Sequence, residues 1–274
     1  MNKITTLIKM IIPPIIVSTY RACNNNRWFT GNYPSWDAAL QDCTGYETDS
    51  ILNKVKESLL KIKDGRAIYE RDSILFNKIQ FSFPLLCGLL RVAVENNGNL
   101  NVLDFGGSLG SSYYQNKEFL SGVKNLRWSI VEQEKFVKVG KEFFEDDILH
   151  FYFTIEECLA NEKTDVIILS SVIQYIERPH ELLSEIVSKK VKYIIIDRTP
   201  FFENHPDQLT VQKVPAEIYN ASYPAWFFNE QIFLKSFEDC YSLIVNVDSF
   251  ESWSIDKIKV QNKCLIFKLQ EKLK

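Results

Sequence analysis

The sequence predicts an α/β fold in which a mostly parallel, seven-stranded sheet with an antiparallel edge strand follows a helical N-terminal extension. From residue 100 onward, short apolar runs alternate with stretches of helical pattern. Runs that are apolar throughout are typical of parallel strands covered by helices on both faces. A turn-rich stretch without a helical pattern joins the last two runs, which indicates antiparallel pairing. The expected strands are Leu100–Phe105, Leu126–Glu132, His150–Thr154, Asp165–Ser170, Val191–Asp197, Tyr241–Val247 and Ile258–Leu269.

The residues before this region have a helical pattern instead. Ser35 is expected to cap a helix that runs to about Asp42, and a second helix is expected over 49–63. Helical segments then continue to about Glu95, with Pro84 as an expected break, and a run of Asn and Gly stops them.

This change of pattern divides the chain into two parts. We predict a helical extension or cap over 1–97 and a cofactor-binding domain over 98–274. Within the second part, residues 200–228 form a long insertion after the fifth strand. Long ordered insertions tend to be functional, so we expect this one to be a substrate lid.

Composition argues against several classes of partner. The net charge of −3 and the pI of 5.8 lack the basic excess of a nucleic-acid-binding protein. The six cysteines form no C-x-x-C pair, which is typical of reduced thiols in a cytoplasmic protein. No stretch reaches the roughly 18 apolar residues of a membrane span. The histidines are too scattered to predict a metal site.

The N-terminus carries an amphipathic pattern that Pro13-Pro14 ends. Two interpretations stay open: residues 1–20 pack on their own domain or on a sister subunit of a homodimer, or they contact a membrane surface at which lipid-linked substrates are made. The apolar residues of this pattern recur at helical spacing: Ile4, Leu7, Ile8, Ile11 and Ile12.

A glycine-rich turn follows the first expected strand and opens a helix. Its residues are Asp104, Gly106, Gly107, Ser108 and Gly110. Glycines allow unusual dihedral angles and let the backbone approach a ligand closely. The turn lies where parallel sheets bind ligands, at the carboxyl end of a strand, although a tight structural turn would have the same residues.

A second acid completes the pattern. Glu132 ends the second expected strand, where a carboxylate can accept hydrogen bonds from both hydroxyls of a ribose, or can simply be a solvated loop acid. The carboxylate of Asp104 opposes a diphosphate but suits a cationic ligand. The pair therefore favours S-adenosylmethionine (SAM) over a dinucleotide.

The motif Asp104-x-Gly106-x-Ser108-x-Gly110 resembles the cofactor loop of class I SAM-dependent methyltransferases, with Ser at the middle Gly. Glu132 matches the ribose-binding acid of that family, and Asp165–Ile176 is similar to its fourth strand and the following loop. The resemblance implies a Rossmann-like fold with SAM as cofactor. It also implies cofactor contacts from Gln133, Ser170 and Ser171, in addition to the loop residues and Glu132.

A narrower resemblance spans nearly the whole chain. It is to a family of methyltransferases from bacterial O-antigen and surface-polysaccharide clusters, which implies cytoplasmic methylation of a sugar-containing small molecule or a lipid-linked glycan. It also implies that Tyr69 and its neighbours fold over the bound cofactor; a salt bridge at a helix start is the alternative. The segments that carry it are Trp28–Trp36, Tyr69–Asp72, Asp197–Phe201, Leu209–Gln212 and Tyr223–Phe227.

Three residues near the expected lid are candidates for catalysis. Histidine is the side chain most suited to exchange a proton near neutral pH, so His205 is the first candidate for a general base, and Asp197 is the second. Arg198 could clamp a phosphate or carboxylate of the acceptor through its planar fork. Tyr223 and Trp226 could stack on a sugar. Each of these residues also has a purely structural interpretation: a surface histidine, a capping carboxylate, a surface ion pair or lid packing.

Two other functions compete with methyl transfer. A non-catalytic, methyltransferase-like scaffold in a glycan-assembly complex would have the same loop and the same amphipathic N-terminus. An NAD-linked sugar oxidoreductase is disfavoured because the sequence lacks the pyrophosphate loop pattern and a Tyr-x-x-x-Lys pair.

Overall fold

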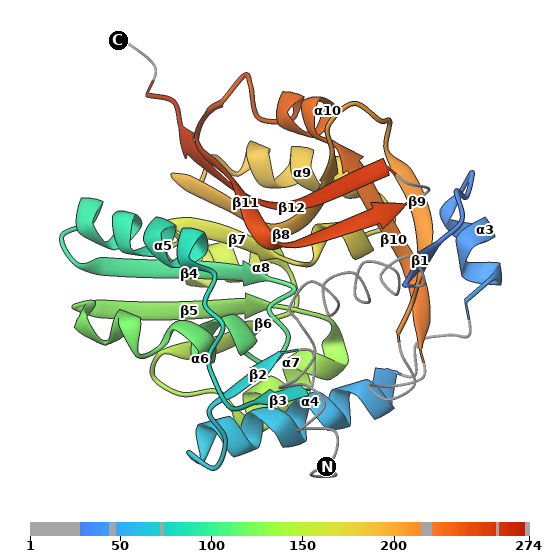
Figure 1. Cartoon of the computed structure of the whole chain (residues 1–274). Helices are drawn as coiled ribbons and strands as arrows, with labels where there is room; N and C mark the ends of the chain where they lie inside the picture. Colours follow the sequence, from blue (N-terminus) through green and yellow to red (C-terminus); the bar gives the residue numbers. More distant parts are fainter. Residues whose placement is uncertain (1–27, 44–47, 72–73, 215–220, 256–257, 272–274) are drawn as a thin grey trace, which may run out of the picture.

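The computed structural model describes residues 28–43, 48–71, 74–214, 221–255 and 258–271. Its centre is a curled sheet with helices on both sides (Figure 1). Seven strands form the body of this sheet: β4 (Asn99–Phe105), β5 (Asn125–Val131), β6 (Leu149–Tyr152), β7 (Val166–Ser170), β8 (Tyr193–Phe202), β11 (Tyr241–Ile255) and β12 (Ile258–Leu269). Their spatial order is β6-β5-β4-β7-β8-β12-β11.

This topology confirms the predicted α/β, Rossmann-like fold class. The strands from β4 to β8 pair in parallel, and each begins and ends within a few residues of its expected position except β8, which is longer. β12 runs antiparallel to both β8 and β11. The antiparallel strand β12 therefore lies between β8 and β11, and β11 is the edge strand. The sequence predicts the antiparallel strand at the edge itself.

Alternation along the strands explains why helices cover both faces. Val166 and Ile168 of β7 belong to one buried cluster, whereas Ile167 and Leu169 belong to another. Successive side chains of a strand point to opposite faces, so an uninterrupted apolar run has to be buried on both. The helices α4 (Thr48–Lys63), α5 (Phe83–Glu95), α6 (Ser111–Asn116) and α7 (Glu134–Phe143) cover the first face, and α8 (Ile155–Asn161), α9 (Pro179–Ser188) and α10 (Glu230–Lys235) cover the second.

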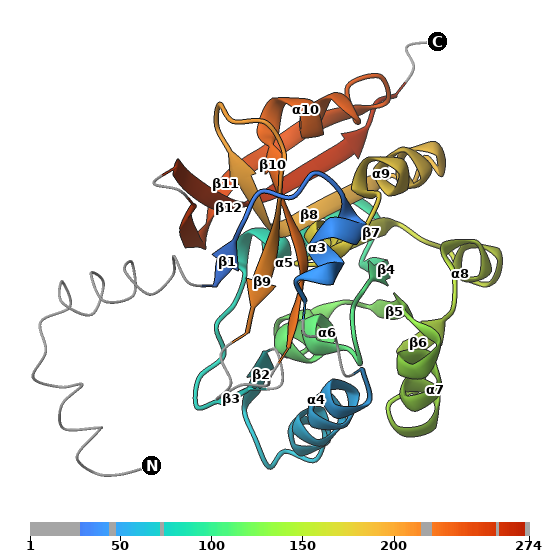
Figure 2. The ribbon, with the colours of Figure 1, turned by 90° about the vertical axis from the view of Figure 1, so that its right-hand side faces the viewer.

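The insertion that is predicted as a lid consists largely of strands. β9 (Gln208–Lys213) and β10 (Ser222–Asn229) pair antiparallel, and residues 215–220 between them lie outside the described residues. β10 also pairs with the carboxyl-terminal end of β8, and β1 (Phe29–Thr30) pairs with β9. Figure 2 shows β1, β9, β10 and α3 (Trp36–Gln41) together at one end of the molecule.

The N-terminal extension confirms two predictions and corrects two others. Ser35 caps α3 by accepting a hydrogen bond from the Ala38 amide at 3.2 Å, and α4 covers the expected range. Pro84 lies in the first turn of α5, so it starts that helix instead of breaking one, because its fixed φ suits that position. The segment around Glu70 is a strand hairpin of β2 (Tyr69–Arg71) and β3 (Ile74–Phe76), not a helix start.

The amphipathic segment over residues 1–20 lies outside the described residues. In the part that the structure describes, no helix has both the length and the apolar character needed to cross a membrane. Among the same residues, Cys43, Cys87, Cys158, Cys240 and Cys264 carry free thiols.

Candidate functional site

A cavity of about 610 Å³ lies at the carboxyl ends of β4, β5, β7 and β8. We call one part of its wall the loop side and the other the hairpin side. The loop side consists of Gly106, Gly107, Ser108, Glu132, Gln133, Ser170 and Ser171. The hairpin side consists of Tyr175, Gln212, Tyr223, Pro224, Ala225, Trp226 and Phe227. Arg198 and Glu70 also line the cavity, on β8 and β2 respectively.

The turn after β4 has the tight geometry that its sequence predicts. Gly106 has a φ of +68°, and a Cβ atom on it would lie 2.3 Å from Cγ2 of Val172. Gly110 has a φ of +105° and precedes α6 without lining the cavity. Both positions need a residue without a side chain, because side chains are strained in this region and the space beside Gly106 is filled.

Three residues of the cavity wall adopt a left-handed backbone without being glycine. Ser108 has a φ of +55°, Ser171 of +57° and Arg198 of +50°. Each follows or lies in a different strand, namely β4, β7 and β8. Such conformations cost about 1–3 kcal/mol each and are found mainly where the surrounding structure enforces them, often at functional sites.

Glu132 reaches back to the turn. Its carboxylate accepts hydrogen bonds from the backbone amides of Ser108 at 3.2 Å and Gln133 at 2.7 Å. Burial raises the pKa of this carboxyl group, and the two amide bonds oppose that rise. The structure thus brings together the glycine turn and the acid at the end of β5, as the sequence predicts.

Asp104 lies beneath the turn instead of on the cavity wall. Its side chain is 1% exposed and accepts a hydrogen bond from Nε1 of Trp128 at 3.1 Å. A Cβ atom on Gly107 would lie 2.5 Å from Cγ of Asp104, so the two residues are in close contact. Burial raises the pKa of Asp104 to about 7. The expected direct contact between Asp104 and a cationic ligand is therefore replaced by support of the turn from below.

Asp197, the second candidate for a general base, is also buried. Its two carboxylate oxygens accept hydrogen bonds from Oγ of Ser82 and Oγ of Ser170, each at 2.9 Å. The residue is 0% exposed and does not line the cavity. Arg198, the next residue, does line it, and its Nε lies 3.8 Å from Oδ2 of Asp197.

His205, the first candidate for a general base, lies outside the cavity wall. Its ring packs on Phe202 with centroids 4.6 Å apart, and its Nδ1 lies 2.8 Å from the backbone oxygen of Pro206. The structure therefore supports the surface-loop interpretation of His205 and does not bring it to the site.

The β2 strand contributes a different residue from the expected one. Tyr69 is buried, and its hydroxyl accepts a hydrogen bond from Nε2 of Gln115 at 3.1 Å. Glu70 lines the cavity instead and accepts a hydrogen bond from Oγ of Ser111 at 2.9 Å. Strand alternation separates the two, since neighbouring residues of a strand point to opposite faces, but the sequence does not predict a strand over this segment.

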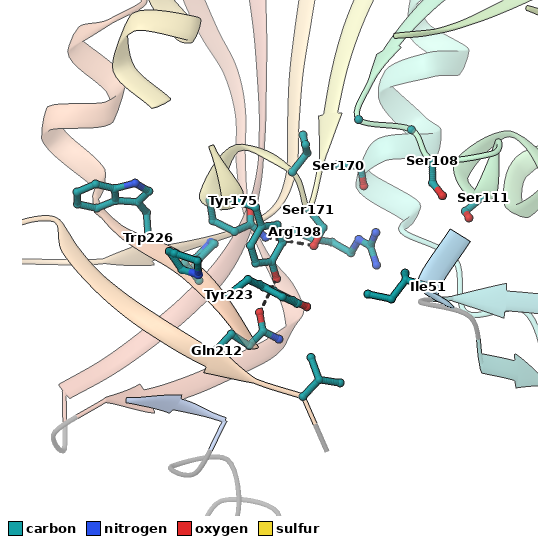
Figure 3. A pocket seen from close by; sticks show the side chains of 18 of the residues that line it. Ile51, Ser108, Ser111, Ser170, Ser171, Tyr175, Arg198, Gln212, Tyr223 and Trp226 are labelled. Atoms are coloured by element: carbon teal, nitrogen blue, oxygen red, sulfur yellow. Dashed lines mark hydrogen bonds between the residues drawn. The ribbon is translucent and has the colours of Figure 1, made fainter. Parts of the chain in front are cut away.

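The hairpin side combines aromatic rings with amide side chains (Figure 3). The hydroxyl of Tyr175 donates a hydrogen bond to Oε1 of Gln212 at 2.9 Å, and its ring meets that of Tyr223 edge to face at 5.3 Å. Tyr223 and Trp226 line the cavity as expected, and so does Tyr175, which lies in the segment similar to the loop after the fourth strand but is not singled out by the sequence. Long-range strand pairing brings these residues together, so no local motif marks them.

The chemistry of the cavity follows from its charges. Glu70, Glu132 and Glu251 line it, and Arg198 is the one cationic side chain among its described lining residues. The wall thus suits a ligand with positive charge on the loop side. No group of three His, Cys, Asp or Glu residues able to hold a metal ion is found in the described ranges.

Comparisons with known proteins give a likeness of fold only. No family model and no curated protein matches the chain. The N-terminal domain of EvdMO1, solved with S-adenosylhomocysteine (SAH) and D-fucose, is 11% identical, with 82% of this chain and 98% of that chain covered at a TM-score of 0.47. A SAM-dependent methyltransferase from Clostridium acetobutylicum is 13% identical, with coverages of 70% and 93% and a TM-score of 0.45.

A third solved structure is magnesium protoporphyrin IX methyltransferase from Synechocystis with bound SAH. It is 13% identical, with 82% of this chain and all of that chain covered, at a TM-score of 0.42. Because each of these TM-scores is below 0.5, the function of this chain has to be argued from its own residues.

Proposed function

We propose that this chain is a SAM-dependent methyltransferase that methylates an oxygen atom of a sugar or sugar-linked group in bacterial surface-polysaccharide synthesis. The observation that carries the proposal is the contact between Glu132 and the glycine turn at the open edge of a parallel sheet. This is the edge at which open α/β sheets bind nucleotide-type ligands.

The loop side fits the cofactor in size and charge. Ligand cavities usually measure about 300–1,000 Å³, and this one, at about 610 Å³, has room for a nucleoside and an acceptor. Glu132 would accept hydrogen bonds from ribose hydroxyls. The turn from Gly106 to Ser108 would lie against the amino acid part, and Gln133, Ser170 and Ser171 would flank the bound molecule.

When bound, SAM would supply an electrophilic methyl group on a sulfonium, which an acceptor oxygen can attack from the side opposite the sulfur. The contribution of this chain is then to hold the acceptor at the right distance and angle, to exclude water and, for a hydroxyl acceptor, to take up its proton. Since His205 and Asp197 do not line the cavity, the carboxylates of Glu70 and Glu251 are the described candidates for that proton.

The hairpin side supports a sugar as acceptor. Aromatic rings such as those of Tyr175 and Tyr223 offer apolar faces, and the amide of Gln212 offers hydrogen bonds to hydroxyl groups. The proposal extends to a cytoplasmic location, to peripheral membrane contact through residues 1–20 and to a homodimer. The resemblance in sequence to polysaccharide-cluster methyltransferases is its support on those points.

Binding of SAH, the demethylated product, tests the assignment. We expect Glu132→Gln to weaken binding at least tenfold, equivalent to about 1.4 kcal/mol, because the neutral amide loses charge-assisted bonds to the ribose. Isothermal titration calorimetry measures this directly. Glu134→Gln is the matched control, since Glu134 lies two residues away on the exposed start of α7 and pairs with Lys138.

Equal SAH affinities of the wild type and the Glu132→Gln variant would remove the assignment. Binding of SAH without transfer of labelled methyl groups to any sugar pool would favour the alternative of a non-catalytic scaffold.

A further inference from the structure

β8 carries a single irregularity, and it lies at the cavity. Ile196 pairs with Leu265 of β12, and Thr199 pairs with Lys263. Two residues of β8, Asp197 and Arg198, therefore oppose the single residue between those partners. This is a β-bulge, a feature that bends a strand locally and changes the direction of a side chain.

The bulge turns a charged side chain out of a buried strand. Nine of the ten residues of β8 are buried, and Arg198 is the exception. Its φ of +50° is unfavourable for a residue with a long side chain, so the surrounding pairing has to enforce it. Figure 3 shows the side chain of Arg198 among the labelled residues that line the cavity.

Asp197 lies beside the guanidinium of Arg198. Oδ2 of Asp197 lies 3.8 Å from Nε of Arg198. The two carboxylate oxygens of Asp197 also accept hydrogen bonds from the hydroxyl groups of Ser82 and Ser170. The two serine hydroxyls hold the Asp197 carboxylate in place, and that carboxylate in turn lies beside the Nε end of the Arg198 guanidinium. Three residues further along, β8 meets β10 of the hairpin, because Phe201 pairs with Phe228.

From this arrangement we propose that the acceptor is an anionic saccharide and that Arg198 binds its oxyanion, either the carboxylate of a sugar acid or the phosphate of a sugar phosphate. The inference rests on the proposed function and deepens it. A neutral sugar gains little from a cation held in a strained backbone conformation. An oxyanion, in contrast, would be repelled by Glu70, Glu132 and Glu251 unless a cation bound it.

The planar guanidinium is suited to this task. It can donate two parallel hydrogen bonds to a carboxylate or a phosphate, which fixes orientation as well as position. The rings of Tyr175 and Tyr223 would then lie against the sugar, and the oxyanion would orient its hydroxyl groups relative to the loop side.

The test measures sugar binding to the SAH-saturated protein by calorimetry. The probes are D-glucuronate, D-glucose 1-phosphate and, as the neutral match, D-glucose. We expect at least one anionic sugar to bind the wild type ten or more times more tightly than glucose. Arg198→Ala should abolish that preference, and Arg198→Lys should retain part of it, since it keeps the charge but not the fork. Both variants should bind SAH within about twofold of the wild type.

Arg178→Ala is the matched control, because Arg178 is an exposed arginine outside the cavity wall. It should leave every sugar affinity unchanged. If Arg198→Ala does not fold, as judged by circular dichroism, Arg198→Gln replaces it, since Gln keeps the polarity and much of the stem.

Two results would overturn the inference and leave the proposed function standing. In the first, the wild type binds both anionic sugars no more tightly than glucose. In the second, the Arg198 variants lose SAH affinity tenfold or more, which would assign Arg198 to the cofactor. Failure of the wild type to bind SAH at all would instead remove the proposed function, and with it this inference.

Discussion

The two sides of the cavity are built in different ways. The loop side comes from the ends of neighbouring parallel strands, and its key contact joins Glu132 to a backbone amide 24 residues away. The hairpin side depends on contacts between residues that lie further apart in the sequence. The hydrogen bond from Tyr175 to Gln212 joins residues 37 positions apart. The hydrogen bond from Nε2 of Gln208 to the Gly31 carbonyl joins residues 177 positions apart. Backbone geometry specifies the first side, and side-chain packing between distant strands specifies the second.

This difference suggests a division of tasks. A loop side fixed by glycine dihedrals tolerates few changes, and it would bind the same cofactor whatever the acceptor. The hairpin side can change its lining residues while β9 and β10 keep their pairing, so it is the part on which acceptor specificity would depend. Mutations on the two sides should therefore differ in what they impair and by how much.

The largest effect is expected for Gly106→Ala. An alanine there would place its Cβ 2.3 Å from Val172 and would hold a strained φ of +68°. Crowding and backbone strain together should displace the turn and lower SAH affinity about a hundredfold, equivalent to about 2.8 kcal/mol. Calorimetric titration with SAH measures the loss.

Gly65→Ala separates the two causes. Gly65 has nearly the same φ, +69°, but no atom lies within 4 Å of the Cβ position. This variant should lose about 1 kcal/mol of stability through strain and keep its SAH affinity. Equal SAH affinities of Gly106→Ala and Gly65→Ala would show that the backbone of the turn does not determine the binding geometry of the loop side.

Asp104→Asn should change how stability depends on pH. The pKa of Asp104 rises from 3.8 to about 7 on folding, chiefly because the carboxyl group is buried. The unfolded chain therefore releases this proton at lower pH than the native protein does. The wild type loses stability as the pH rises from about 4 to about 7, while an asparagine, which can still accept the Trp128 bond, avoids that loss.

Between pH 5 and pH 8, the wild type should lose about 2–3 kcal/mol of unfolding free energy relative to Asp104→Asn. Urea unfolding of both proteins without ligand measures the difference. The charge of Glu132 also raises the pKa of Asp104, so the difference between the two proteins includes this interaction. If the unfolding free energies of the two proteins changed with pH in parallel, Asp104 would be ionised in the native state without a loss of stability.

The sequence predicted the loop side better than the hairpin side for a physical reason. Strand positions follow from apolar runs, and the turn follows from glycines whose dihedrals are a local property. Ser35 and Glu132 could be predicted because a cap and a strand end are also local. Burial of Asp104 could not be predicted, since it depends on Trp128 from the neighbouring strand.

The hairpin side depends on pairing that the sequence does not reveal. The lid expected over residues 200–228 stays a prediction, but the sequence does not reveal that most of these residues continue β8 or form β9 and β10. Arg198 was a candidate, but the bulge that aims it into the cavity arises from its register with β12. His205 is a candidate because of its residue type, and the residue type says nothing about where the side chain points.

Tyr175→Phe tests the hairpin side with the smallest change. The variant lacks the hydroxyl that donates a partly buried hydrogen bond to Gln212, so it should lose about 1 kcal/mol of stability. Its SAH affinity should be unchanged. Tyr33→Phe is the matched control, because its hydroxyl donates to Asp42 at an exposed position where water can replace it. We expect that variant to lose less than about 0.5 kcal/mol. Urea unfolding compares the two variants, and equal losses, or a loss of SAH affinity in Tyr175→Phe alone, would contradict the proposed independence of the two sides.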